Sequence, residues 1–214
     1  MLRNKPTTYE NFGFAANTIL NNTHICVTGN DGNVHTYRPT EIEFYYNGEG
    51  HKDHYTHGNA DQLTKCKFYF HKFASGSYKS GTFKGMDITL SPDGKAYYGV
   101  LIRSVMDVNT GEFIEGPCRV VNKFLCLFGF TSVAQFVKDK TIPLDIYDTP
   151  EIHVIHDCIK QDDTEPIYKG PRIGLNNDKY PDWRKKNYRC AIYIKKIKKE
   201  KKKFIVVDNI ADQL

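Results

Sequence analysis

Apolar and polar residues alternate in short runs along much of this 214-residue chain, a pattern typical of half-buried β-strands. The sequence Asn30-Asp31-Gly32-Asn33 predicts a tight turn that joins the first two runs into a hairpin. The run over 97–105 is apolar on both faces, so we expect a central strand there. In all, the pattern predicts strands over 24–28, 34–46, 66–73, 86–90, 97–105, 152–159, 190–197 and 204–207.

Apolar residues with helical spacing are confined to three segments. These predicted helices cover 10–21, 118–127 after the helix-opening pair Gly116-Pro117, and 131–138. No linker or repeat is visible. The chain is therefore predicted to be one α+β domain over 1–214, a mixed, mostly antiparallel β-sheet with flanking helices. We expect 1–9 to be a flexible N-terminus.

Composition indicates a globular protein. Aromatic residues make up 13% of the chain, which is unlike a disordered protein. No apolar run approaches a membrane span, and the start of the chain lacks the apolar core of a signal peptide. The six cysteines are scattered without a C-x-x-C pair. This spacing argues against structural zinc and favours reduced thiols, so we expect an intracellular protein that does not bind membranes.

Positive charge is concentrated near the C-terminus. The segment from Arg184 to Lys203 holds eleven lysines or arginines and one acid, whereas the whole chain carries a net charge of only +5. The run from Lys195 to Lys203 could contact phosphates or act as a nuclear import signal, which predicts a nuclear protein if the source is eukaryotic. The alternative is a solvated tip of a hairpin at 195–203. The candidate DNA-binding lysines are Lys195, Lys196, Lys198 and Lys199.

The most informative stretch ends the second predicted strand. Glu43 and Tyr45 lie two residues apart, so in a strand their side chains share one face. His51, His54 and His57 follow in a polar, glycine-bearing loop. A carboxylate beside aromatic and imidazole surfaces suits a site that stacks on a flat heterocycle and activates a water. The alternative is an edge strand with a solvated acid and polar loop histidines.

Several other chemistries find no matching motif. The glycines of 75–85 fit neither a P-loop nor a dinucleotide fingerprint, and no serine lies in a G-x-S-x-G elbow. The loop histidines lack a second set of ligands, and His153 and His156 fall on opposite faces of a predicted strand. We therefore expect no metal site.

Short motifs along the chain resemble, in order, those of the alkyladenine (methylpurine) DNA glycosylases. The resemblance covers residues 15–213. It rests on A-N-T-I-L, I-C-V-T-G-N-D-G-N, T-E-I-E-F-Y, D-H-Y-T-H, G-V-L-I-R, G-P-C-R-V, R-I-G-L, Trp183, the segment Tyr188 to Tyr193, and F-I-V-V-D-N-I-A-D-Q.

This resemblance implies a methylpurine-DNA-glycosylase-like curved sheet and a monofunctional DNA glycosylase. Such an enzyme flips a damaged base out of DNA and hydrolyses its N-glycosidic bond, which leaves an abasic site. Glu43 then corresponds to the general base, and Arg103 and the carbonyl of Ile173 position the attacking water. Tyr45 and His57 correspond to walls of the base pocket. The resemblance implies DNA as partner, a monomer, and no metal or redox cofactor.

One part of the family pattern is altered. Family members carry two tyrosines before a Gly-Met pair, one closing the base pocket and one wedging into DNA, but Gly81 and Lys84 occupy these positions here. Phe83 or Tyr78 are the available substitutes. Phe83, Lys84 and Arg172 complete the predicted DNA-contacting set. The lesion range and duplex DNA as substrate stay open.

The implied roles have structural alternatives. Arg103 could be a buried ion-pair partner, including of Glu43, Tyr45 could pack in the core, and His57 could be a loop residue. Besides the glycosylase, two functions stay open. One is a hydrolase of the same fold acting on RNA or a nucleoside, and the other is a nucleic-acid-binding module that has lost catalysis.

Overall fold

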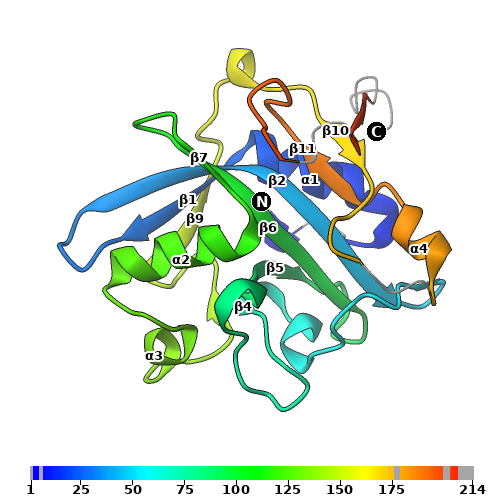
Figure 1. The fold of residues 1–214 in the computed structure, drawn as a ribbon, viewed down its shortest axis with the longest axis horizontal. Coiled ribbons are helices and arrows are strands. Elements are labelled where there is room, and N and C mark those ends of the chain that lie inside the picture. Colours follow the sequence, from blue (N-terminus) through cyan, green and yellow to red (C-terminus); the bar gives the residue numbers. More distant parts are fainter. Residues whose placement is uncertain (1, 5–6, 176–178, 200–202, 207–214) are drawn as a thin grey trace.

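A computed structural model of the chain describes residues 2–4, 7–175, 179–199 and 203–206. One large, twisted antiparallel sheet crosses the molecule, and four α-helices flank it in this part of the chain (Figure 1). The helices are α1 (Phe12–Asn21), α2 (Pro117–Phe128), α3 (Val133–Val137) and α4 (Pro181–Lys185). The strands are β1 (Thr23–Thr28), β2 (Val34–Gly48), β3 (His51–Lys52), β4 (Lys65–Phe70), β5 (Met86–Leu90), β6 (Tyr97–Asp107), β7 (Phe113–Glu115), β8 (Leu144–Asp145), β9 (Ile152–His156), β10 (Tyr168–Gly170), β11 (Arg189–Ala191) and β12 (Ile205–Val206).

The long antiparallel pair β2 and β6 forms the centre of the sheet. The order of the main path is β12-β10-β11-β2-β6-β5-β4-β8, with β1, β3, β7 and β9 attached at its sides. The pairing of β2 with β6 shifts register between Pro39 and Ile42, and such irregularities bend a strand and increase its twist. These observations confirm the predicted α+β fold with one largely antiparallel sheet.

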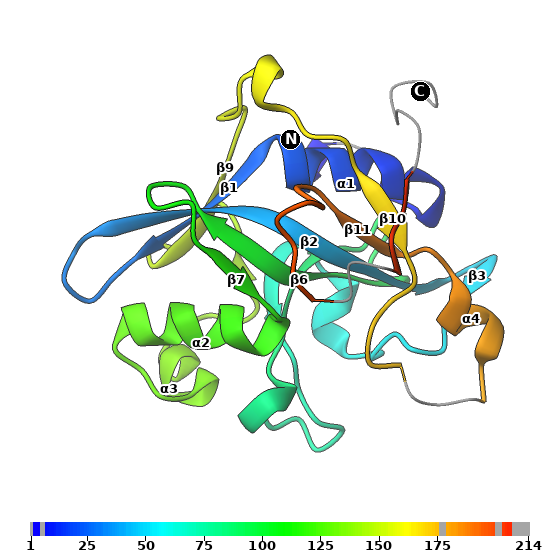
Figure 2. The same cartoon turned by 45° about the horizontal axis from the view of Figure 1, so that its top comes forward.

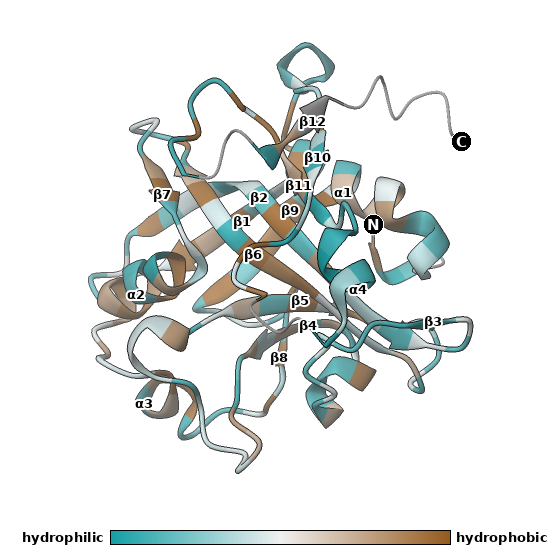
Figure 3. Cartoon of the chain, turned by 45° about the vertical axis from the view of Figure 1, so that its right-hand side comes forward, coloured by the Kyte–Doolittle hydropathy of each residue, from teal (hydrophilic) through white to brown (hydrophobic). Residues whose placement is uncertain are grey.

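Helices cover the long strands from two sides. Figure 2 shows α1 on one side of β2 and β6, and α2 with α3 on the other. Phe12 of α1 stacks on Phe44 of β2 with ring centroids 4.4 Å apart, and Phe124 of α2 packs 5.2 Å from Tyr37. Burial of each such ring stabilises the fold by about 2–3 kcal/mol, and Figure 3 shows apolar residues along the strands between these helices.

The alternation along β2 separates two kinds of buried side chain. Ile42 and Phe44 face the apolar core, and both are almost fully buried. Glu41, Glu43 and Tyr45 lie on the opposite face because successive residues of a strand point to opposite sides. Glu43 is 0% exposed. This second face therefore buries charged groups, which is costly unless they are paired.

Two predicted features near the C-terminus differ from the structure. The strand predicted over 190–197 ends at Ala191, and Tyr193 has a φ of +55°, a left-handed conformation that cannot continue a strand. The predicted hairpin tip at 195–203 is wrong, because β10 lies between β11 and β12 and pairs with both. This segment instead connects two strands that are not neighbours, and residues 200–202 lie outside the described part of the chain.

The N-terminal segment packs against the domain, so the expectation of a flexible segment is wrong for its described residues. Leu2 is completely buried in the core. Arg3 pairs with Asp145 at 3.0 Å, and the hydroxyl of Thr7 donates to the carbonyl of Leu90 at 2.7 Å. One apolar anchor and two polar contacts thus hold these residues in place.

Candidate functional site

Three donors from different parts of the chain hold the buried carboxylate of Glu43. The hydroxyl of Tyr45 donates to Oε2 at 2.8 Å, and the amide N–H of Ile173 donates to Oε1 at 2.8 Å. Nη1 of Arg103, from the neighbouring strand β6, lies 3.2 Å from Oε1. The structure therefore brings together the three predicted catalytic residues Glu43, Arg103 and Ile173, together with Tyr45.

The protonation of this group follows from its burial. Burial raises the pKa of Glu43 above its ordinary value, while Arg103, the Ile173 amide and the Tyr45 hydroxyl oppose that rise. Burial and the adjacent Glu43 raise the pKa of Tyr45 well above its ordinary value, so this hydroxyl stays protonated and can donate. The carboxylate is thus oriented by fixed donors, and it binds a proton more readily than an exposed glutamate.

Arg103 bridges two carboxylates of β2. Its Nε donates to Glu41 at 2.9 Å while Nη1 faces Glu43, and the hydroxyl of Ser104 donates to Glu41 at 3.0 Å. Burial alone would lower the pKa of Arg103, but Glu43 and Glu41 raise it. The ion pair between Arg103 and Glu43, left open by the sequence, is thus present. It fixes the guanidinium beside Oε1 of Glu43, the oxygen that also accepts the Ile173 N–H.

Ile173 lies at the expected place but makes a different contact. Its amide N–H, and not its carbonyl, touches Glu43. That the carbonyl of Ile173 positions the attacking water stays a prediction. A backbone donor stabilises the ionised carboxylate, because a hydrogen bond to the charged form favours that form.

The side chain of Arg172 is buried and does not reach solvent. Its side chain is 0% exposed, it forms a two-pronged ion pair with Asp53, and it donates to the carbonyls of Phe44 at 3.0 Å and Trp183 at 3.2 Å. The guanidinium also lies 4.5 Å from the ring centre of Tyr45. The prediction of Arg172 as a DNA contact is thus wrong, and its position shows a clamp that holds the chain around Ile173 against β2.

The three loop histidines diverge in the structure. His51 is buried, between the carbonyl of Tyr46 and the hydroxyl of Tyr188, whereas His54 stacks on Tyr180. His57 lies elsewhere, beside β4. No group of three or more potential ligands is placed to hold a metal ion among the described residues.

His57 belongs to a second polar cluster. Its Nδ1 lies 3.3 Å from the hydroxyl of Tyr69, its Nε2 lies 3.1 Å from Nζ of Lys79, and its ring packs edge-on against His71 at 4.4 Å. Partial loss of hydration and the adjacent His71 lower the pKa of His57 to about 4. The residue is nevertheless exposed to solvent. His57 is therefore neutral near pH 7 and presents an uncharged ring.

The structure places four further side chains around these residues that the sequence did not single out: Glu41, Asp53, His71 and Asp87. Glu41 follows from the same alternation that selected Glu43, since it lies two residues earlier on the same face. Asp53, the partner of Arg172, stood within a quoted motif but had no role assigned. The pair of His71 with Asp87 carried no sequence signal, because the two residues meet only through the pairing of β4 with β5.

Comparison with known proteins adds one relative. The uncharacterized protein L759 of Acanthamoeba polyphaga mimivirus is 42% identical over 202 residues, which cover 89% of each chain. The chain belongs to the same family as L759. No known protein-family profile matches it.

The remaining predicted DNA contacts lie on the surface of this L759-family protein. Phe83 is 70% exposed, and Nζ of Lys84 contacts the carbonyl of Gly81 at 3.3 Å. The four candidate lysines, Lys195, Lys196, Lys198 and Lys199, are all exposed.

The lysine segment is fastened beside the strand that carries Arg103. Ile197 is buried, and the carboxylate of Glu115 accepts the backbone N–H groups of Lys198 and Lys199 at 2.9–3.3 Å. The next residue, Gly116, donates its N–H to the carbonyl of Arg103 at 2.8 Å. The backbone is thus held near the site while the four lysine side chains reach solvent.

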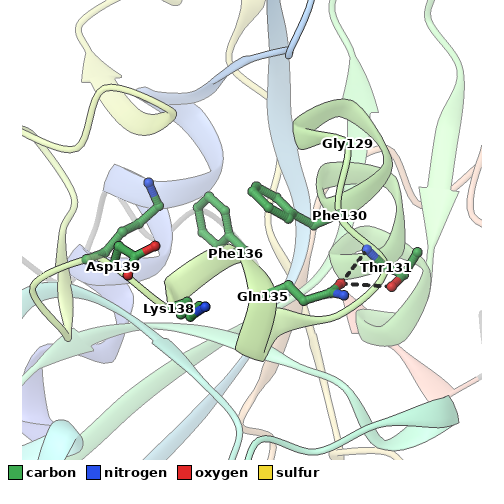
Figure 4. A pocket seen from close by; sticks show the side chains of 8 residues that line it. Gly129, Phe130, Thr131, Gln135, Phe136, Lys138 and Asp139 are labelled. Carbon is green, nitrogen blue, oxygen red and sulfur yellow. Dashed lines mark hydrogen bonds between the residues drawn. The ribbon is translucent and has the colours of Figure 1, made fainter.

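Two surface cavities stand out in the L759-family chain. One, of about 630 Å³, reaches the Glu43-binding residue Ile173 and is bordered by the cationic side chains Arg184, Lys185 and Lys203. The other, of about 440 Å³, is lined by the connection that follows α2, by α3 and by the residues just after α3 (Figure 4). There the side-chain oxygen of Gln135 accepts from the hydroxyl of Thr131 and the backbone N–H of Ser132, and Lys140 pairs with Glu151. The first cavity therefore lies closer to the candidate chemistry.

None of the described helices is long and apolar enough to span a lipid bilayer.

Proposed function

We propose that this protein is a monofunctional DNA glycosylase that hydrolyses the N-glycosidic bond of a damaged or modified base. The observation that carries the proposal is the carboxylate of Glu43, buried and held by Tyr45, Ile173 and Arg103. The resemblance of the surrounding motifs to the alkyladenine DNA glycosylases agrees with this chemistry.

The proposed reaction needs little beyond these residues. Glu43 accepts a proton from a water that attacks C1′, and the negative charge also stabilises the oxocarbenium-like transition state. Arg103 and the amide of Ile173 keep Glu43 in one orientation and favour its ionised form. The base has to leave the stack first, which costs a few kcal/mol and least for damaged or mispaired bases. Tyr45 and His57 are the proposed surfaces against which the flipped base stacks.

Positive charge near the site suits an anionic polymer. The cavity beside Ile173 is bordered by Arg184, Lys185 and Lys203, and the exposed lysines of 195–199 lie next to the strand of Arg103. Phosphate contacts supply most of the non-specific affinity for DNA. We propose that these two groups of cations hold the backbone while the base enters.

The decisive experiment measures base release directly. Wild-type protein and the Glu43→Gln variant are incubated with duplex and single-stranded oligonucleotides that carry different damaged bases, and alkali then cleaves the strand at any abasic site. We expect cleavage with the wild-type protein alone. Tight DNA binding without cleavage of any substrate would instead indicate a binding module.

A first prediction concerns the nucleophile. Water is expected to attack, so the product strand stays intact and carries an abasic site without a Schiff base. Borohydride added during turnover should therefore trap no covalent protein–DNA complex. A trapped complex would contradict the proposal, and Lys79 would be the first candidate, because burial lowers its pKa and it lies beside His57. Loss of the complex in Lys79→Arg would identify it.

A second prediction concerns the exposed lysines. Changing Lys195, Lys196, Lys198 and Lys199 to glutamine should weaken DNA binding to all sequences alike. The log–log salt dependence should flatten by about one for each lost phosphate contact, with little change in the rate at saturating DNA. Binding titrations at several salt concentrations measure both quantities.

A matched control has the same change in net charge. It replaces four exposed lysines outside the segment, namely Lys52, Lys95, Lys138 and Lys160. If both quadruple variants lose affinity equally, the effect comes from overall charge. If neither does, the lysine segment is a solvated connection and DNA binds elsewhere.

A further inference from the structure

A second pair of titratable side chains, His71 and Asp87, lies on the same face of the sheet as Glu43. Nε2 of His71 lies 2.6 Å from Oδ1 of Asp87, and their side chains are only 12% and 2% exposed. Glu43, Leu101, Asp87 and Tyr69 are direct cross-strand partners on β2, β6, β5 and β4. Residues in one such row point to the same face, so Asp87 stands two strand spacings from Glu43, about 10 Å.

Two glycines make the room for this pair. A Cβ atom at Gly99 would lie 2.3 Å from Oδ2 of Asp87, so the carboxylate occupies the space above Gly99. Gly99 is the cross-strand partner of Tyr45, so Asp87 leans toward the strand of the candidate base. A Cβ atom at Gly85 would lie 2.6 Å from the ring of His71. Neither glycine has a positive φ, so close packing and not a turn explains them.

The groups around His71 come from three elements. Asp87 on β5 takes one ring nitrogen, Tyr69 on β4 lies near the ring, and His57 packs edge-on against it. Lys79 contacts the far side of His57. The imidazole is thus fixed by a carboxylate on Nε2, which leaves Nδ1 to exchange a proton with a ligand.

We propose that His71, oriented by Asp87, protonates a ring nitrogen of the leaving base, an inference that rests on the proposed function. Water forms the new bond to C1′ and gives a proton to Glu43, while the electron pair of the broken C1′–N bond stays on the base. His71 gives its proton to that base, which departs neutral. Glu43 and His71 then return to their starting states by exchange with solvent. The pair would therefore assist the release of a neutral base, which leaves poorly without a proton.

The test compares two leaving groups in the same duplex. One oligonucleotide carries hypoxanthine, a neutral base, and the other carries 7-methylguanine, whose fixed positive charge removes the need for protonation. Single-turnover rates are measured for wild type, His71→Gln, Asp87→Asn and Glu43→Gln. His35→Gln, on the far end of β2, is the matched histidine control.

Loss of the proton donor should be selective. His71→Gln should slow hypoxanthine release about 100-fold or more and change 7-methylguanine release only a few-fold. Asp87→Asn should slow hypoxanthine release more than 7-methylguanine release, because the imidazole loses the carboxylate that orients it. A purely structural role would slow the release of both bases alike. Thermal unfolding of each variant shows that it is folded.

The other outcomes separate the two hypotheses. Suppose that wild type releases hypoxanthine, but His71→Gln and Asp87→Asn slow the release of the two bases equally, or of neither. The role of His71 is then wrong, and the glycosylase proposal stands. Release of 7-methylguanine alone by wild type also overturns the inference. If wild type releases no base from any oligonucleotide, the proposed function itself fails.

Discussion

Glu43→Gln is expected to reduce base release by about 10²–10⁴-fold while DNA affinity stays close to that of wild type. The amide keeps the shape of the side chain and can still accept from the Ile173 N–H, but it cannot take a proton from water. Single-turnover release and equilibrium binding to the same oligonucleotide separate the two effects. Substantial release by this variant would exclude Glu43 as the general base.

The same substitution has a distinctive effect on stability. The pKa of Glu43 is higher in the folded protein than in an unfolded chain, so the folded state binds more protons between the two values. The free energy of unfolding contributed by this group therefore falls as pH rises through that window. Glu43→Gln removes the dependence, so near pH 7 we expect a melting temperature at or above that of wild type. A clear loss of stability would show that Gln cannot satisfy Arg103 and Tyr45.

Alternation within one strand was enough to select the central residue of the site. A period of two places Glu43 and Tyr45 on one face whatever the rest of the chain does, and the structure shows their side chains hydrogen-bonded. The apolar run over 97–105 likewise indicated a central strand. The structure confirms this, because β6 lies between β2 and β5. Features of this kind are local, so the sequence contains them.

Contacts between strands are not local, and the sequence could not supply them. The row that brings Asp87 near Glu43 exists because β6 pairs with both β2 and β5 in one register. Very short strands gave no detectable period: β10 has three residues and was missed, and its position between β11 and β12 removed the predicted hairpin. The resemblance to a family placed Ile173 and Arg172 near the site, but only coordinates distinguish an amide donor from a carbonyl, or a buried clamp from a DNA contact.

Breaking the buried pair of Asp53 with Arg172 should have the largest effect on stability. Both side chains are 0% exposed, and loss of one partner from such a pair costs about 3–5 kcal/mol because the remaining charge is left uncompensated. For a domain of this size that corresponds to about 6–20 °C in melting temperature. We therefore expect Asp53→Asn to melt well below wild type in a thermal scan. The matched control is Asp148→Asn, which removes a carboxylate from an exposed pair with Arg3 and should cost about 1 kcal/mol or less.

The clamp should also matter for activity, because Arg172 holds the segment whose Ile173 amide binds Glu43. At a temperature where Asp53→Asn is still folded, base release is expected to fall while binding to DNA changes little. Adding Arg172→Met to Asp53→Asn removes the uncompensated charge and should recover part of the lost stability, but not the lost activity, since the contacts to Phe44 and Trp183 are gone. Equal stability of Asp53→Asn and wild type would mean that the pair does not hold this segment. Recovery of both stability and base release in the double variant would mean that the segment needs no clamp.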